Sequence, residues 1–273
     1  MNGRSRIARY VVLSFLALVM IAPFVWMLST SLKAPHQVLV YPPALIPDPI
    51  HWSNFRDVWL VAPFGRYLAN SAVVAVLVTA LELITASLAA FAFARLRFKG
   101  RDALFFLYLA TLMIPGQVTI VPNFVLMRLF GWLDTYFALI IPAAFTVSGT
   151  FLLRQYFLTI PRELDQAARI DGCGPFGVYA RIIVPLASPA IATMALFAFV
   201  GQWNAFLWPL VITNSESMRT VAVGLRFLVD STQVQFHLLM AAALLSTLPT
   251  IVLFMALQNA FVRGIAFTGL GGR

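Results

Sequence analysis

Four polar side chains interrupt otherwise apolar stretches of this sequence. Glu82 is the only acid inside an expected membrane-spanning segment, and Gln202, Trp203 and Asn204 form a polar and aromatic cluster in another. Polar groups are costly in hydrocarbon, so these residues are candidates for a translocation path. Indole faces stack on sugar rings and amides bond to hydroxyls, so the cluster suits a carbohydrate. The alternatives are a helix-packing carboxyl bonded to Thr79 or Thr85 and an interfacial tryptophan with amide bonds between helices.

No constellation of catalytic residues accompanies this cluster. The sequence has no G-x-x-x-x-G-K-[ST] phosphate loop, because neither Lys33 nor Lys99, its only lysines, follows a glycine. None of the three histidines begins an H-E-x-x-H metal site, and no G-x-S-x-G nucleophile motif occurs. The single cysteine, Cys173, excludes an internal disulfide. We therefore expect no catalytic residue, no metal and no cofactor bound by this chain.

The composition is that of a membrane protein. Hydrophobic residues make up 61% of the chain and charged residues 11%, and the mean hydropathy is +0.88, far from an average soluble domain. The formal charge of +9 could suggest nucleic acid, but the basic residues lie in clusters between apolar runs. Such clusters are typical of topology signals, so we expect a lipid bilayer and no nucleic acid as a partner.

The apolar runs predict six transmembrane helices and an all-α integral membrane protein. The third run contains Pro115 and Pro122, which predict a broken helix that lines a cavity. The proline-rich segment 33–66 and the polar segment 214–236 are expected to be external loops. The runs lie near residues 10–29, 68–94, 104–126, 136–157, 186–212 and 238–261.

Basic residues predict the orientation of these helices. Thirteen of the 19 lysines and arginines lie at the two ends of the chain, in segment 95–101 and in segment 154–181. The six on the other side are Lys33, Arg56, Arg66, Arg128, Arg219 and Arg226. Because cytoplasmic loops carry the excess of basic residues, both termini and the central loop are predicted to be cytoplasmic.

The central loop, Glu163–Pro189, has the pattern of a helix–turn–helix on a membrane surface. Glu163 and Asp165 fall in the first turn of the first helix, where acids are favourable. Gly172 ends that helix, and Pro175 can start a second, which we expect to end before Pro185. A plain amphipathic connector resting on lipid headgroups is the alternative.

The same loop carries a family resemblance. The run Ala167-Ala168-x-x-Asp171-Gly172, followed by Ile182-Ile183-Val184-Pro185, resembles the EAA loop of permease subunits of binding-protein-dependent ATP-binding-cassette (ABC) importers. Gln166 replaces the family's glutamate and Val184 its leucine. Further similarity to the maltose-type carbohydrate branch lies in Asn70-Ser71, Ala94-Arg95, Met113-Ile114-Pro115, Ile160-Pro161, Trp203-Asn204, Gln258 and Gly264.

The resemblance implies a fold, a mechanism and a set of partners. It implies a type I ABC importer permease fold with a coupling loop, 159–185, between the fourth and fifth helices. The implied mechanism is alternating access, with ATP and magnesium bound by two partner ATPase subunits. A second homologous permease and an extracytoplasmic solute-binding protein complete the implied assembly. The implied ATPase-coupling residues are Glu163, Asp165, Gln166, Ala167, Ala168, Asp171, Gly172 and Pro185.

The function that follows is import of a sugar or sugar derivative across a bacterial or archaeal cytoplasmic (inner) membrane. Glycerol phosphates and polyols are alternative solutes of similar permeases, and an ion-coupled secondary transporter with Glu82 as proton site is an alternative mechanism. We divide the chain into a first transmembrane helix with its external loop, a permease core and a cytoplasmic tail. These parts cover residues 1–66, 67–262 and 263–273.

Overall fold

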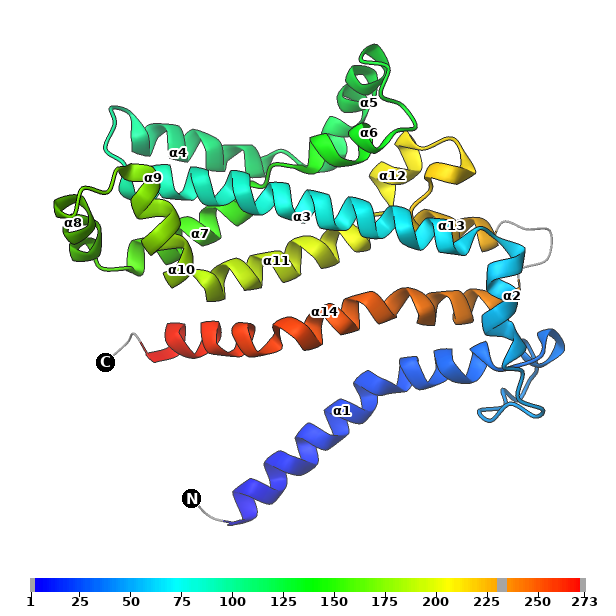
Figure 1. Ribbon diagram of the computed structural model, residues 1–273. Coiled ribbons are helices and arrows are strands. Elements are labelled where there is room, and N and C mark those ends of the chain that lie inside the picture. The colour runs from blue at the N-terminus through cyan, green and yellow to red at the C-terminus, as the bar shows by residue number, and fades with distance from the viewer. Residues whose placement is uncertain (1–2, 230–234, 271–273) are drawn as a thin grey trace. The chain divides into compact units, whose positions relative to one another are not determined.

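The computed structural model describes the backbone of residues 3–229 and 235–270, and the side chains of residues 9–229 and 235–258. The described residues form helices and loops and contain no strand, which confirms the all-α class. They divide into two compact units, and the α-helices are labelled in Figure 1. Unit 1 comprises residues 1–67 and 223–248, and unit 2 comprises residues 68–222 and 249–273.

Unit 1 contains the first membrane helix and the external segment that follows it. Asn54 fastens this segment, because its Nδ2 donates to the carbonyls of Ser31 at 2.8 Å and Lys33 at 2.9 Å. The Lys33 ammonium lies 4.8 Å from the centre of the Trp26 ring. The elements are α1 (Gly3–Ser31), η1 (Pro35–Gln37), α2 (Ser53–Val61), the start of α3 (Phe64–Arg95), most of α13 (Val221–Val229) and the first part of α14 (Phe236–Leu270).

Six spans are present if each bent helix pair counts as one. The helical stretches Arg9–Ser31, Phe64–Arg95 and Phe236–Gln258 are each long and apolar enough to cross a membrane. Three pairs of shorter helices pass the same test together: Arg101–Met113 with Gly116–Leu129, Tyr136–Ala143 with Val147–Thr159, and Pro175–Leu186 with Ser188–Trp203. They bend by 87°, 42° and 78° respectively. The predicted number of spans is therefore confirmed.

Proline explains where the third span breaks. Pro115 sits between the two halves of the 87° pair, and its missing N–H and fixed φ stop the first half. Pro122, by contrast, lies in the first turn of α5, where a helix tolerates proline. The elements of this span are α4 (Arg101–Ala110), η2 (Thr111–Met113), η3 (Gly116–Thr119) and α5 (Ile120–Leu129).

The fourth and fifth spans are also interrupted, which the apolar runs did not indicate. The fourth breaks at 144–146, where the side chain of Thr146 caps a new helix by accepting a bond from the Gly149 amide at 3.2 Å. The fifth bends near Ala187 and stops at Trp203, before a separate short helix. The elements are α6 (Tyr136–Ile140), η4 (Ile141–Ala143), α7 (Val147–Thr159), α11 (Ser188–Trp203) and α12 (Leu207–Ile212).

The segment 214–236 is also more ordered than a plain polar loop. It contains η6 (Glu216–Met218) and α13, while residues 230–234 lie outside the described part of the chain. Likewise, α14 continues to Leu270, through most of the expected tail, and residues 271–273 lie outside the described residues.

Two apolar clusters hold unit 2 together. One joins the C-terminal half of α3 to α7 and α11 through small and aromatic side chains, including Ala90, Phe157 and Met194. The other joins the N-terminal half of α3 to α5, α6 and α12, with Val78, Leu139 and Ile212 buried. The alanines of α3 permit close approach of the neighbouring helices, as is typical of membrane bundles.

Candidate functional site

The first candidate site is the central loop, whose helix α8 (Arg162–Ile170) ends in a complete Schellman motif. The amide of Gly172 donates to the carbonyl of Arg169 at 3.1 Å, and the amide of Cys173 donates to the carbonyl of Ala168 at 2.8 Å. Gly172 has a φ of +82°, a left-handed conformation that favours glycine. The chain therefore turns sharply here, as the sequence predicted.

The second part of the loop is one irregular helical path. It consists of α9 (Pro175–Val178), η5 (Tyr179–Ile183), which is a π-helical turn, and α10 (Val184–Leu186). The expected helix end before Pro185 was wrong, because the helical path continues to Leu186. A wider turn just before Pro185 relieves the clash that this ring would otherwise make with a preceding carbonyl.

The candidate coupling residues divide between two faces of the loop. Asp165 and Ala168, one helical turn apart, are buried against the rest of unit 2. The remaining six are exposed: Glu163, Gln166, Ala167, Asp171, Gly172 and Pro185. The two alanines of the motif thus differ, since Ala168 packs inward and Ala167 presents a small side chain outward. Apolar Leu164, Ile170 and Phe176 are also exposed on this loop.

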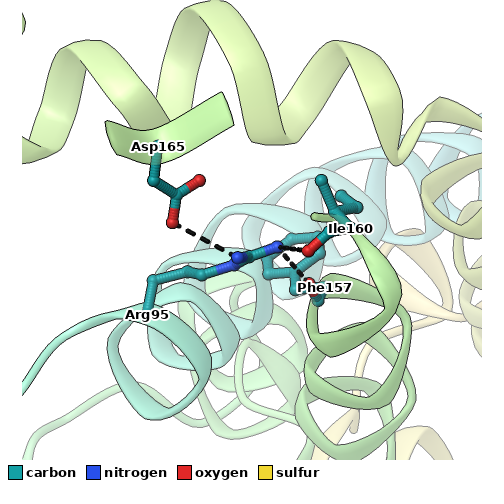
Figure 2. A network of polar contacts seen from close by, with 4 residues as sticks. All are labelled: Arg95, Phe157, Ile160 and Asp165. Atoms are coloured by element: carbon teal, nitrogen blue, oxygen red, sulfur yellow. Dashed lines mark hydrogen bonds and ion pairs between the residues drawn. The ribbon is translucent and has the colours of Figure 1, made fainter. Parts of the chain in front are cut away.

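A buried arginine anchors the inward face. Arg95, the last residue of α3, forms an ion pair from Nη1 to Asp165 Oδ2 at 3.2 Å. Its Nη2 donates to the carbonyls of Phe157 and, at 2.7 Å, of Ile160, which end α7 (Figure 2). The Phe157 carbonyl also accepts from the amide of Ile160, the residue that follows α7, at 3.2 Å. The guanidinium thus binds the carbonyl end of α7 and joins the ends of α3, α7 and α8. As Figure 1 also shows, α8, α9 and α10 gather where α3 ends.

The second candidate site is a pocket of about 350 Å³ inside unit 2. Glu82 on α3 and Gln202 on α11, both predicted path residues, meet here, with Gln202 Nε2 donating to Glu82 Oε1 at 3.3 Å. Thr146 and Ser148, near the start of α7, add two hydroxyls. The expected alternative for Glu82, a bond to a neighbouring threonine side chain, is not what forms. Thr85 instead donates to backbone carbonyls, including that of Ala144 at 2.8 Å.

The other two predicted path residues lie close by in sequence but do not line this pocket. Trp203 is buried, and its ring stacks on that of Phe199 with centroids 5.6 Å apart. Asn204 is exposed and donates from Nδ2 to the carbonyl of Val200 at 2.9 Å, which caps α11. A third group of polar contacts, around Asp134, braces the segment that begins at Asn214.

Sequence reasoning missed Arg95 as part of the loop's site and missed Thr146 and Ser148 in the pocket. Arg95 stood out as one of four basic residues that indicate topology and in the Ala94-Arg95 similarity to the maltose-type branch. Its spacing of 70 residues from Asp165 carries no periodic signal that would pair the two. The two hydroxyls become neighbours of Glu82 only because the fourth span breaks, which the apolar pattern does not reveal.

A family model described as "Binding-protein-dependent transport system inner membrane component" matches residues 82–267. This range includes both the loop and the pocket. The chain belongs to this family.

Individual members of this inner membrane component family are similar over nearly the whole chain. The sn-glycerol-3-phosphate transport system permease protein UgpE of Yersinia enterocolitica is 36% identical, with 84% of each chain covered. The arabinooligosaccharides transport system permease protein AraQ of Halalkalibacterium halodurans is 32% identical, with 95% of this chain and 94% of the relative covered. These relatives are permease proteins, which confirms the expectation of a translocation subunit and not an enzyme.

A solved structure confirms the permease fold of this inner membrane component. A chain from the crystal structure of a bacterial ABC transporter involved in the import of the acidic polysaccharide alginate matches with a TM-score of 0.83 and 25% identity. The match covers 96% of this chain and 99% of the other. A chain of the alginate transporter in complex with its alginate pentasaccharide-bound periplasmic protein shares the fold, with a TM-score of 0.67 and 14% identity.

Proposed function

We propose that this chain is one of two transmembrane subunits of an ATP-driven importer for a sugar or sugar derivative, working by alternating access. Family membership supports the transport role, and the names of relatives support the solute. Those relatives carry sn-glycerol 3-phosphate, arabinooligosaccharides or alginate. All three solutes are rich in hydroxyl groups but differ in charge.

The observation that carries this proposal is the two-faced central loop. Its inward face is tied to α3 and α7 by Arg95 and Asp165, while Glu163, Gln166 and Ala167 are exposed on its outward face. A helix held rigidly at the end of a span can transmit a push from a bound partner to that span. Binding of ATP by the partner ATPase subunits would supply the push, and the permease pair would then change its accessible side.

The full assembly in this proposal has five subunits. Two are homologous permeases, two are ABC ATPases that bind ATP and magnesium, and one is an extracytoplasmic solute-binding protein. The loop and both termini face the cytoplasm, as the distribution of basic residues indicates. The segment from Asn214 to Phe236 is the proposed contact for the binding protein, and the pocket at Glu82 and Gln202 is part of the proposed path.

Substitution of Ala167 by tryptophan tests the coupling role. Ala167 is exposed and Ala168 is buried, so a bulky side chain at position 167 reaches a docked ATPase without disturbing the packing beneath. We expect Ala167→Trp to insert normally and to lower transport-coupled ATP hydrolysis by about tenfold, because added bulk at a packed contact costs about 1–3 kcal/mol. The measurement is ATPase activity and solute uptake of the purified assembly in proteoliposomes.

The matched control is Ala44→Trp, which places the same side chain at an exposed alanine in the proline-rich segment 33–66, far from the central loop in sequence. It should retain activity within about twofold, as exposed sites away from an interface usually do. Full activity of Ala167→Trp would contradict the coupling role. Uptake by the chain alone that collapses with an uncoupler and ignores ATP would contradict the ABC mechanism.

A further inference from the structure

The pocket at Glu82 is lined by both polar and apolar groups. The polar groups are the carboxyl, amide and hydroxyl groups of Glu82, Gln202, Thr146 and Ser148. The apolar side chains include Leu152, Met194 and Phe197. Its volume of about 350 Å³ lies within the range that small-molecule sites occupy. A solute that carries both hydroxyl and C–H groups has a partner for each kind.

The ionisable group that lines this pocket is acidic. Among the residues that line it in the described part of the chain, Glu82 is the one acid, and none is a lysine or an arginine. Arg154 is on the same helix as Leu152, but its guanidinium lies over the Phe105 ring at 4.0 Å and its Nε donates to the carbonyl of Phe93 at 3.4 Å. The pocket therefore offers an anion no basic partner.

A carboxylate is an acceptor only, so a bound solute must bring donors to it. Hydroxyl groups of a sugar or polyol do so, whereas a phosphate monoester or a uronate presents further acceptors and negative charge. Like charges repel more strongly in a low-dielectric site than in water, and desolvated anions without a partner are costly. An acid placed against the path is thus a means of rejecting the wrong solute as well as holding the right one.

We propose that Glu82 and Gln202 form a subsite for uncharged, hydroxyl-rich solutes and that the Glu82 carboxylate excludes anionic ones. This inference rests on the proposed function. The proposed function allows both uncharged and acidic solutes, and this inference selects the uncharged ones. It makes Glu82 a specificity-determining residue in the transport step.

Uptake of two pairs of solutes, matched in size and different in charge, tests this subsite. The pairs are glucose with glucuronate, and maltotriose with a mannuronate trisaccharide. Each is offered at high concentration to proteoliposomes that contain the assembled importer and its binding protein. The readout is the ratio of uncharged to anionic uptake within a pair. Because the same binding protein is present in every preparation, its own preference cancels when variants are compared with the wild type.

The quantity compared is the change in this ratio from the wild type, which one unfavourable charge contact of modest strength can shift by about tenfold. Glu82→Asp keeps the charge and should keep the preference, while Glu82→Gln, of nearly the same shape, should reduce it several-fold. An unchanged ratio in Glu82→Gln, or a ratio that falls equally in Glu82→Asp and Glu82→Gln, would overturn the inference. In either case ATPase activity stimulated by the binding protein would show that the proposed function still stands. Loss of that stimulation in the wild type would instead remove the proposed function.

Discussion

The ion pair between Arg95 and Asp165 shows how Asp165 can support the proposed ATPase contact surface of α8 without being part of that surface. Asp165 was expected to share in binding the ATPase, yet its carboxylate is turned inward to the guanidinium of Arg95. Both side chains are almost fully buried, with 2% and 11% of their surfaces exposed. A buried pair of this kind contributes little net free energy compared with apolar packing, but removal of one partner leaves an uncompensated charge. Its role in the proposed mechanism is therefore to hold α8 in place.

The substitution Asp165→Asn is expected to destabilise the protein by about 3 kcal/mol, the lower end of the range for breaking a buried pair, because Arg95 keeps its two carbonyl partners. Thermal unfolding in detergent measures this. The control, Glu163→Gln, neutralises an exposed acid in the same turn and should change stability by less than about 0.5 kcal/mol. Equal stabilities of the two variants would contradict the anchoring role.

At this scale, the sequence could predict which residues are candidates for function, but not which residues they contact. Glu82 and Gln202 stood out because polar groups are rare inside apolar runs, and the structure brings them together across 120 residues. Which polar groups meet depends on helix rotation and on breaks, which local composition does not encode. For the same reason Ala167 and Ala168 read as equivalent in the sequence, whereas one is exposed and the other buried.

Among the elements, the segment that begins at Asn214 is held in place by side-chain hydrogen bonds to other parts of the chain, which a plain connector would not need. Asp134 accepts hydrogen bonds from the amides of Asn214 at 2.9 Å and Ser215 at 3.0 Å. Asn70 donates from Nδ2 to the carbonyls of Ser217 and Arg219, both at 2.9 Å. The segment is therefore held to α3 and to the loop before α6, so that it can present a defined surface.

Acid should loosen this segment. Burial acts to raise the pKa of Asp134, but the hydrogen bonds from Ser215 and Asn214 outweigh it and hold the pKa below its ordinary value. A lowered folded-state pKa contributes stability above the unfolded pKa of about 4, and this contribution is lost as the pH falls through the folded value.

We expect Asp134→Asn to cost about 1 kcal/mol near neutral pH, since bonds to a charged acceptor are stronger than bonds to an amide. Asparagine tolerates the φ of +60° at this position, so backbone strain does not confound the comparison. Thermal unfolding of both proteins between about pH 7 and about pH 3 measures the effect. The difference should shrink below about pH 4, and a difference independent of pH would contradict the assignment.

At the scale of the whole molecule, hydropathy alone predicted six spans, because the bilayer thickness fixes the length of an apolar helix. It did not predict that three of these spans are bent pairs. The breaks fall at Pro115, which the proline residues did predict, and at a threonine cap and near Ala187, which depend on local backbone conformation. An average over a window of side chains has no access to that information.

The orientation of the chain is the property on which the proposed mechanism depends most, and Cys173 provides a direct test of it. This residue is the only cysteine, and it lies half-buried just after the turn at Gly172. A membrane-impermeant maleimide should therefore label the unmodified chain in inside-out vesicles and not in intact spheroplasts. The control is Cys173→Ser combined with Glu216→Cys, which moves the thiol to an exposed site in the segment that begins at Asn214. Its labelling should show the opposite sidedness. Labelling of Cys173 from the outside would place the loop away from ATP, and coupling through α8 would then be excluded.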